Sequence, residues 1–335
     1  MIPTRPATPD PALEARVLSR TPLRYAEGAD PHLDRPAHVR AGSSLAWVPG
    51  GIAVVQDDAN FLAVVDPADA RARSLTLAVG PGGRRQFDDE RGNKRHKLDL
   101  EACVALDDGG RALLVALGSG SLPRREHALL VDGWESGRPR PTLVHVPALY
   151  AALRDAADFA GGELNLEGAV AVGDRVRLLG RGNGTARDGV AAANAICDLD
   201  RAARLGHLRD PARWPPPTPT DVARYDLGTL DGIALGFTDA TAWAGTLLYV
   251  AAAEDSPDAV RDGRVAGSAL GVLDERGDAR WAPITDADGR RFVGKVEGVL
   301  DARGTTERLL VVVDADDPDA PSELCTVELR GPWRR

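Results

Sequence analysis

Four acidic residues recur along the chain, each between an apolar residue and a very small one. They are Glu101 in Leu100-Glu101-Ala102, Glu167 in Leu166-Glu167-Gly168, Asp231 in Leu230-Asp231-Gly232 and Glu297 in Val296-Glu297-Gly298. The intervals between them are 66, 64 and 66 residues, and Ser44, 57 residues before Glu101, marks a degenerate fifth copy. A recurring period is the signature of a repeat architecture. Because equivalent positions in a closed ring converge on its axis, the spacing predicts a ring of carboxylates.

Such a ring has three interpretations. Four carboxylates at close quarters cannot all stay ionised unless positive charge compensates them. A hard ion such as Ca²⁺ accepts these ligands, which makes all four acids candidate metal ligands. Alternatively, Lys97, Arg181 and Lys295 supply the charge and the site binds a polar ligand without metal. In the third interpretation the acids bond backbone amides of the neighbouring repeat and lock the ring.

The lysines of this chain are unusually placed. Only three of its 41 basic residues are lysines, namely Lys94, Lys97 and Lys295, and each lies within seven residues before a repeat acid. Lysine is a compact amine that titrates readily when buried. We therefore add Lys97 and Lys295 to the four acids as candidate catalytic residues.

Short strands follow each repeat acid. After Glu101 the apolar runs are 102–106, 112–117, 128–131 and 142–146, separated by turn residues. Four strands in roughly 65 residues are typical of a propeller blade. The sequence thus predicts an all-β, five-bladed β-propeller, with six blades as the alternative if a long linker contains a further sheet.

The last copy lacks a fourth strand because the chain ends at Arg335. Residues 15–25 include an apolar-rich segment that can supply this strand, and closing the ring removes two exposed sheet edges. We therefore predict an N-terminal tail over 1–14 and a single propeller domain over 15–335. Residues 147–160 have helical spacing, and 201–220, which contain Trp214, are predicted to form an irregular loop.

One end of the ring collects the candidate binding residues. The second strand of each copy runs antiparallel to the first, so its last residues return to the end that carries the acids. The polar residues predicted there, with the degenerate copy, are Ser44, Asp57, Ser119, Arg181, Asn183, Glu254, Asp255 and Asp314.

Composition excludes several classes of partner. The net charge of −9 argues against nucleic acid and anionic membrane surfaces. We expect a cytoplasmic protein because there is no secretory signal and no run of about 18 apolar residues.

Cys103, Cys197 and Cys325 are odd in number and lie in apolar runs, which favours buried thiols. The absence of a Gly-x-Ser-x-Gly turn disfavours a serine hydrolase.

Several segments resemble an uncharacterised bacterial propeller family between about residues 44 and 329. They include Asp99-Leu100-Glu101-Ala102, Asn165-Leu166-Glu167-Gly168, Ala253-Glu254-Asp255, Lys295-Val296-Glu297-Gly298 and Asp314-Ala315-Asp316-Asp317-Pro318. This resemblance implies the fold and no activity. More distantly, an acid followed by Gly at the start of an inner strand is similar to phytase-like esterase domains and to lactonase propellers of the gluconolactonase and paraoxonase type. The lactonases imply an axial Ca²⁺ held by acids and asparagines.

Two functions follow as hypotheses. One is a hydrolase of an ester, lactone or phosphoester, in which a bound cation polarises the substrate and a carboxylate activates water. The other is a non-catalytic propeller that binds a small ligand or a protein through the end of the ring that carries the acids, or through the loop that contains Trp214. Both hypotheses predict a small-molecule ligand at this end of the ring, and neither specifies an oligomeric state.

Overall fold

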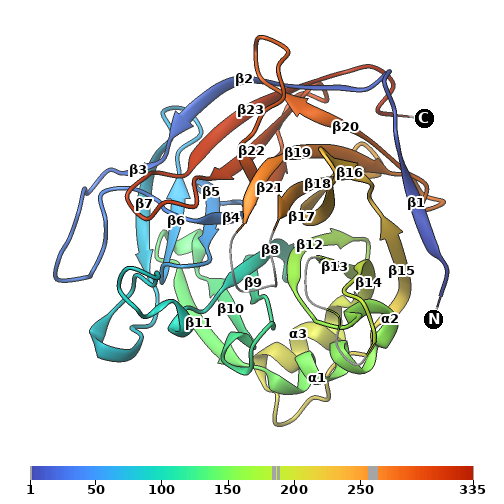
Figure 1. The fold of residues 1–335 in the computed structure, drawn as a ribbon. Coiled ribbons are helices and arrows are strands. Elements are labelled where there is room, and N and C mark those ends of the chain that lie inside the picture. The colour runs from blue at the N-terminus through green and yellow to red at the C-terminus, as the bar shows by residue number, and fades with distance from the viewer. Residues whose placement is uncertain (1, 183–185, 187–188, 256–262, 335) are drawn as a thin grey trace.

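The computed structural model describes residues 2–182, 186, 189–255 and 263–334. The described residues form an all-β ring in which sheets surround a common centre and the helices lie at the periphery (Figure 1). The alternation of short apolar runs with Gly, Asp and Pro turns accounts for this architecture.

The described strands pair as five antiparallel runs. The first contains β4 (Gly42–Val48), β5 (Gly51–Gln56), β6 (Phe61–Val65) and β7 (Arg71–Thr76). The second contains β8 (Leu100–Asp107), β9 (Ala112–Gly118), β10 (His127–Asp132) and β11 (Arg140–His145). The third contains β12 (Leu166–Val172), β13 (Arg175–Gly180), β14 (Asn194–Asp200) and β15 (Thr220–Asp226). The fourth contains β17 (Ile233–Trp243), β18 (Thr246–Asp255), β19 (Arg264–Leu273) and β20 (Ala279–Thr285). The fifth contains β21 (Lys295–Asp301), β22 (Arg308–Asp314), β23 (Glu323–Arg330) and β2 (Glu14–Pro22).

The first strand of each run is the innermost. Strand β4 contacts β8, β8 contacts β12, β12 contacts β17, β17 contacts β21, and β21 returns to β4. Contacts between inner strands therefore close a complete circle around the axis, as Figure 1 shows.

The N-terminal segment closes the ring. Strand β2 pairs antiparallel with β23, from Glu14 opposite Arg330 to Pro22 opposite Glu323, which confirms the predicted closing strand. Strand β1 (Thr4–Pro9) pairs in parallel with β15 and then with β20. The residues predicted as a tail thus contain a strand that joins the third and fourth runs. Two short strands, β3 (Arg24–Tyr25) and β16 (Thr229–Leu230), extend the edges of other runs.

Apolar side chains fill the spaces between neighbouring sheets. Between the first and second runs, Val55 and Leu62 pack in one cluster with Leu114 and Ala116, and all four are at most 1% exposed. Burying a Val or Leu side chain in this way stabilises the fold by about 1.5–3 kcal/mol. The inter-sheet core therefore holds the inner strands, and the side chains they carry, in fixed positions.

The α-helices of the described residues lie in two connections, one from β11 to β12 and one from β14 to β15. The predicted helix over 147–160 is present as α1 (Pro147–Asp155) and α2 (Ala157–Ala160). Helix α3 (Arg201–Arg209) corrects the prediction of an irregular loop from residue 201. The missed signal is Asp200, whose Oδ1 accepts a hydrogen bond of 2.7 Å from the Ala203 amide and caps the helix. Among the described residues, no helix has the length and apolar character of a membrane span.

Candidate functional site

Each inner strand contains a β-bulge, which leaves one residue outside the pairing with the second strand. These residues are Ser43, Glu101, Glu167, Thr238 and Glu297. A bulge re-aims the side chain of its unpaired residue. Three of the four repeat acids therefore occupy equivalent positions around the ring.

Asp231 is the exception and corrects the predicted ring of four acids. It lies in the turn between β16 and β17, with a φ of 51°. Its side chain is exposed and forms an ion pair with Arg291. Asp tolerates such a left-handed turn conformation, and Thr238 occupies the bulge position instead. The Leu-Asp-Gly sequence that imitates the repeat is thus a turn motif.

The degenerate first copy is also displaced by one residue. Ser43, rather than Ser44, lies in the bulge, and its Oγ donates a hydrogen bond of 2.5 Å to the Leu100 carbonyl. The hydroxyl of Thr238 donates in the same way to the Val296 carbonyl, at 2.7 Å. Both hydroxyls bond the next inner strand. These contacts connect neighbouring inner strands, but they join hydroxyls to carbonyls, whereas the third interpretation had acids bonding backbone amides.

The ends of the second strands meet the start of the inner strands. Asp57, Ser119 and Arg181 directly follow β5, β9 and β13. Their amides donate hydrogen bonds of 3.1, 2.9 and 2.9 Å to the carbonyls of Ala41, Asp99 and Asn165, respectively. Each acceptor lies two residues before a bulge residue, so both sets of side chains lie at one end of the ring. We call this end the mouth.

Glu167 is held on both carboxylate oxygens. Asn165 Nδ2 donates a hydrogen bond of 2.6 Å to Oε1, and Arg181 Nη1 lies 3.5 Å from Oε2. Burial raises the pKa of Glu167 to about 8, although the charge of Arg181 opposes this shift. Arg181 also donates a 2.8 Å hydrogen bond to Glu254 Oε2. Gly236 leaves room for the arginine, because a Cβ there would lie 2.8 Å from Arg181 Cγ.

Glu297 has a cationic partner of its own. Lys295 Nζ lies 3.0 Å from Glu297 Oε1, 3.1 Å from Asp316 Oδ1 and 3.6 Å from Glu254 Oε2. Burial alone lowers the pKa of Lys295, but attraction to Glu297, Glu254 and Asp316 outweighs it and raises the pKa. Lys295 is therefore a fixed positive charge between three carboxylates.

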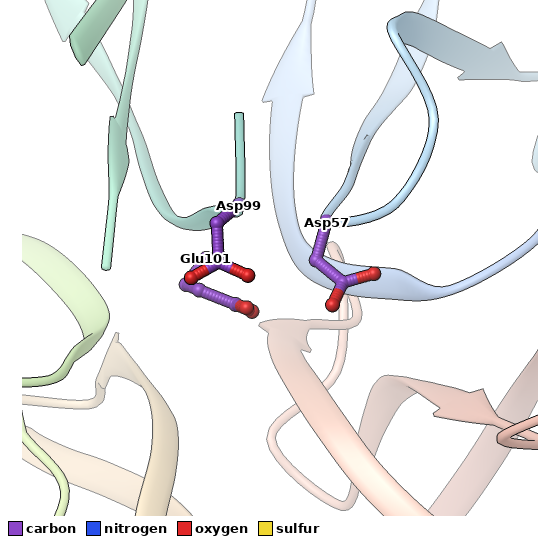
Figure 2. Close-up of side chains that lie close together, drawn as sticks. All are labelled: Asp57, Asp99 and Glu101. Atoms are coloured by element: carbon purple, nitrogen blue, oxygen red, sulfur yellow. The ribbon is translucent and has the colours of Figure 1, made fainter. Parts of the chain in front are cut away.

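Glu101 lies in a cluster with Asp57 and Asp99 (Figure 2). Lys97 Nζ lies 2.6 Å from Asp99 Oδ1 and also contacts Asp57, while Arg125 Nη1 lies 2.7 Å from Asp99 Oδ2. Within the described part of the chain, the half-buried Glu101 side chain has no hydrogen bond or ion pair. Burial raises its pKa well above the ordinary value, and the charges of Asp57 and Asp99 add to this shift.

The same cluster is where the described residues are compatible with a metal ion. One carboxylate oxygen from each of Asp57, Asp99 and Glu101 lies within 4.8 Å of the others. Three carboxylates suit a hard cation such as Ca²⁺. However, the Lys97 amine already bridges Asp57 and Asp99, so a metal between these two carboxylates would have to displace it. The predicted set of Glu101, Glu167, Asp231 and Glu297 does not form a common ligand sphere.

A cavity of about 230 Å³ opens beside this cluster, with Asp57 in its wall and with Asp99 and Glu101 outside its lining residues. Its wall includes all three lysines, which gives a structural meaning to their placement in the sequence. Eight of its lining residues are acidic and four are basic, so the cavity favours ligands that are not anionic. Asp314 is among the acidic ones, and burial together with the charge of Asp316 raises its pKa well above the ordinary value.

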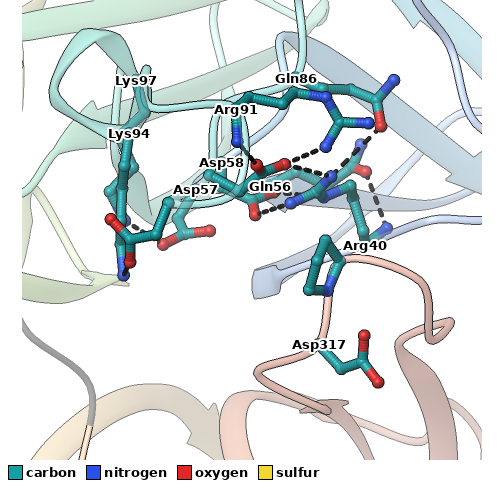
Figure 3. A network of polar contacts seen from close by, with 12 residues as sticks. Arg40, Gln56, Asp57, Asp58, Gln86, Arg91, Lys94, Lys97 and Asp317 are labelled. Carbon is teal, nitrogen blue, oxygen red and sulfur yellow. Dashed lines mark hydrogen bonds and ion pairs between the residues drawn. The ribbon is translucent and has the colours of Figure 1, made fainter.

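Arg40 anchors one side of this cavity (Figure 3). Its guanidinium donates hydrogen bonds to both oxygens of Asp58 and, at 3.2 Å, to Asp88 Oδ2. Burial and the neighbouring Asp57 raise the pKa of Asp58 to about 6, against the opposing charge of Arg40. Arg40 was not predicted from the sequence, although a charged residue between Val39 and Ala41 is a signal for a buried pair.

Asp99 and Asn165, two positions before the bulge acids Glu101 and Glu167, were also not predicted as site residues, whereas Lys295, two positions before Glu297, was predicted. Asp99, Asn165 and Lys295 hold this position, and Asn165 and Lys295 each bond the acid that follows. Of the other predicted binding residues, Ser119 is buried and its Oγ donates to Asp99. Asp255 is exposed at the end of β18. Asn183 lies outside the described residues.

Fold and site together define an all-β, ring-shaped protein of the propeller type with a polar, charge-paired mouth. Residues 38–329 match the family described as "Family of unknown function (DUF6929)", and the chain belongs to that family. The predicted membership in an uncharacterised propeller family is thereby confirmed. None of the curated proteins matches the chain in sequence.

Solved structures with a similar course of the chain include enzymes and a calcium-binding protein. Glutaminyl cyclase from Myxococcus xanthus is 10% identical, with a TM-score of 0.47 over 95% of this chain and 97% of that chain. A mannose phosphorylase from Leishmania mexicana is 12% identical, with a TM-score of 0.44 over 93% and 88%. The calcium-binding protein regucalcin from Agrobacterium tumefaciens is 12% identical, with a TM-score of 0.38 over 94% and 96%. With TM-scores below 0.5, these similarities carry no inference about the site.

Proposed function

We propose that the ring is a five-bladed β-propeller whose mouth binds a small polar molecule and hydrolyses an uncharged ester or lactone. The five antiparallel runs serve as the blades, and β2 completes the last one. Glu101 is the general acid and base of the proposed reaction. The three cysteines are buried and form no disulfide with one another, which supports a cytoplasmic location.

The different environments of the three axial glutamates carry this proposal. Glu167 is held by Asn165 and Arg181, and Glu297 is held by Lys295. Glu101 has no such partner in the described residues. Burial and the charges of Asp57 and Asp99 favour the proton-carrying form of this carboxyl group, which can donate a proton to a ligand. Arg181 beside Glu167 and Lys295 beside Glu297 keep two positive charges in fixed positions, and fixed charges of this kind are the preorganisation that catalysis requires.

The charge of the mouth selects the substrate class. Because acidic residues outnumber basic ones in the cavity wall, a phosphoester would be repelled, whereas an uncharged ester or lactone would not. The cations Lys97, Arg181 and Lys295 are all engaged by carboxylates. Positive charge at the mouth thus stabilises the protein's own carboxylates and is not left free for an anionic substrate.

The test is hydrolysis of a panel of uncharged nitrophenyl esters and aliphatic lactones by the purified full-length protein. The Glu101→Gln variant should lose about 10²–10⁴-fold in kcat, the usual contribution of a general acid or base. Glu14→Gln, at an exposed position of β2, serves as the matched control and should retain wild-type activity. Equal rates for wild type and Glu101→Gln would exclude Glu101 from the chemistry.

Non-catalytic binding is the second candidate, because most charges at the mouth are already paired into a closed network. In that case no member of the panel is turned over, but small polar compounds that bind at the mouth raise the Tm. The increase should be smaller in Glu101→Gln than in Glu14→Gln.

A further inference from the structure

Two of the six histidines form a pair that the proposed reaction does not use. His127, the first residue of β10, lies directly opposite His145, the last residue of β11. Their ring centroids are 4.8 Å apart, with 37° between the ring planes. Strand β11 is the last strand of its sheet, and His145 is exposed while His127 is half-buried. The two imidazoles are therefore adjacent to each other and open to solvent on one side.

A backbone contact fixes the proton of His127. Its Nδ1 lies 2.9 Å from the Arg124 carbonyl oxygen. A carbonyl can only accept a hydrogen bond, so Nδ1 carries the proton and the lone pair of the neutral ring is on Nε2. A carbonyl bonded to one ring nitrogen is the usual way in which a metal-binding histidine is oriented.

The environment of His127 also favours the neutral imidazole, which is the form that binds a metal ion. Burial and the neighbouring His145 disfavour the imidazolium and lower the pKa of His127, although the contact with the Arg124 carbonyl opposes this shift. The fixed tautomer and the pairing of the rings are independent of this shift. A strand pair within one sheet holds the two histidines in register, so little ordering entropy remains to be lost on binding.

We propose that His127 and His145 form a binding site for a late first-row transition metal, with Cu²⁺ bound more tightly than Ni²⁺ or Zn²⁺. Imidazole nitrogen suits these ions, and their affinities for a given site follow that order. Among the described residues, neither histidine belongs to a group of three or more metal-ligating side chains. The protein thus supplies two nitrogens, and water completes the coordination. Ca²⁺, which takes oxygen ligands, should not bind here.

The test is Cu²⁺ titration of the tag-free, full-length protein by calorimetry, together with electron paramagnetic resonance. We expect one site whose spectrum shows two coordinating nitrogens. His127→Gln and His145→Gln should each weaken binding by about tenfold or more, whereas His32→Gln, at an exposed position far along the chain, should not. Because imidazoles must be deprotonated to bind, affinity should also fall as the pH is lowered from 7.5 to 5.5.

Circular dichroism shows whether each variant folds. His145 is exposed, so His145→Gln remains informative even if His127→Gln is destabilised. Wild-type affinity in a folded His145→Gln variant, or a spectrum with no more than one coordinating nitrogen in the wild type, would refute the site. Saturating Ca²⁺ should leave the Cu²⁺ isotherm unchanged, and competition by Ca²⁺ would equally refute it.

Discussion

Ser44 Oγ donates a hydrogen bond of 3.0 Å to Asp239 Oδ2, although the two residues are 195 positions apart. Ser44 belongs to β4 and Asp239 to β17, which are inner strands of the first and fourth runs. Asp239 Oδ2 also accepts a hydrogen bond of 3.1 Å from the Val299 amide, in the fifth run. A single carboxyl group therefore connects three runs at the centre of the ring.

This connection predicts how substitutions at Ser44 and Asp239 differ. Burial raises the pKa of Asp239 well above its ordinary value, against the opposing effect of its hydrogen bonds. Burial therefore favours the neutral carboxyl group, whose shape an amide shares. We expect Asp239→Asn to stay within about 1 kcal/mol of the wild type in urea unfolding, and Ser44→Ala to lose about 1–3 kcal/mol. The loss arises because Asp239 and the Cys103 amide both lose a partner.

Asp239→Ala is the control for this interpretation. It removes the acceptor of both Ser44 and Val299 and should be at least as destabilising as Ser44→Ala. If Asp239→Asn is as unstable as Asp239→Ala, an amide cannot replace the carboxyl group, and burial does not favour its neutral form.

Gly168 and Gly298, which follow the bulge acids Glu167 and Glu297, are required because neighbouring inner strands approach them closely. A Cβ on Gly168 would lie 3.1 Å from Asp239 Cα, and one on Gly298 would lie 3.0 Å from Ser44 Cα. Overpacking of this kind costs about 1–3 kcal/mol, so Gly168→Ala and Gly298→Ala should each lower the free energy of unfolding by that amount. Gly180→Ala is the matched control, because its Cβ would meet nothing closer than 3.6 Å. If all three variants unfold with the same free energy as the wild type, the inner strands can move apart to admit the added Cβ, and the prediction is wrong.

Local sequence patterns were sufficient to predict the strands and the closure of the ring. Apolar runs separated by turn residues define the runs, and the missing last strand required a partner such as β2. The strand β1 was not predicted because Thr4–Pro9 is mostly exposed and contains two prolines. It pairs through its backbone with two distant sheets, which leaves no periodic signal in its side chains.

The site was predicted less well because the bulges decide which residue is unpaired. Spacing alone favoured Asp231, whereas β17 is 11 residues long and places its bulge residue, Thr238, seven positions later. A one-residue change of register moves a side chain to the other face of a strand. Sequence spacing identifies the repeat, but the register of each hairpin decides what the repeat contributes. Arg40 was not predicted because its partners Asp58 and Asp88 lie 18 and 48 positions away. Asn165 was not predicted because its contact with Glu167 occurs in one repeat.

Lys295 should be one of the most sensitive positions at the mouth. Removing its amine leaves Glu297, Asp316 and Glu254 without a shared cation, and breaking a buried ion pair costs about 3–5 kcal/mol. We expect Lys295→Met to lose stability by that amount in denaturant unfolding. Arg140→Met is the control, since the side chains of Arg140 and its partner Asp132 are 75% and 59% exposed, and it should change stability by less than about 1 kcal/mol.

A second substitution tests the cause of this loss. Adding Glu297→Gln to Lys295→Met removes one of the carboxylates left without a cation and should recover part of the lost stability. No recovery in the double variant would mean that Lys295 acts through the packing of its aliphatic chain.

The raised pKa of Glu167 predicts how stability depends on pH. Its ordinary value is 4.5 and its folded value is about 8, mainly because of burial. Between these values the folded protein binds more protons than the unfolded chain, so the contribution of Glu167 to stability is complete below about pH 4.5 and is lost as the pH rises through about 8. Relative to Glu167→Gln, which does not titrate, the wild type should lose up to about 1.4 kcal/mol per pH unit in this window. Urea unfolding of both proteins at intervals from pH 5 to pH 9 measures the difference, and Glu14→Gln should follow the wild type throughout. A wild type that gains stability over Glu167→Gln with rising pH would mean that Arg181 outweighs burial and that Glu167 is ionised in the folded ring.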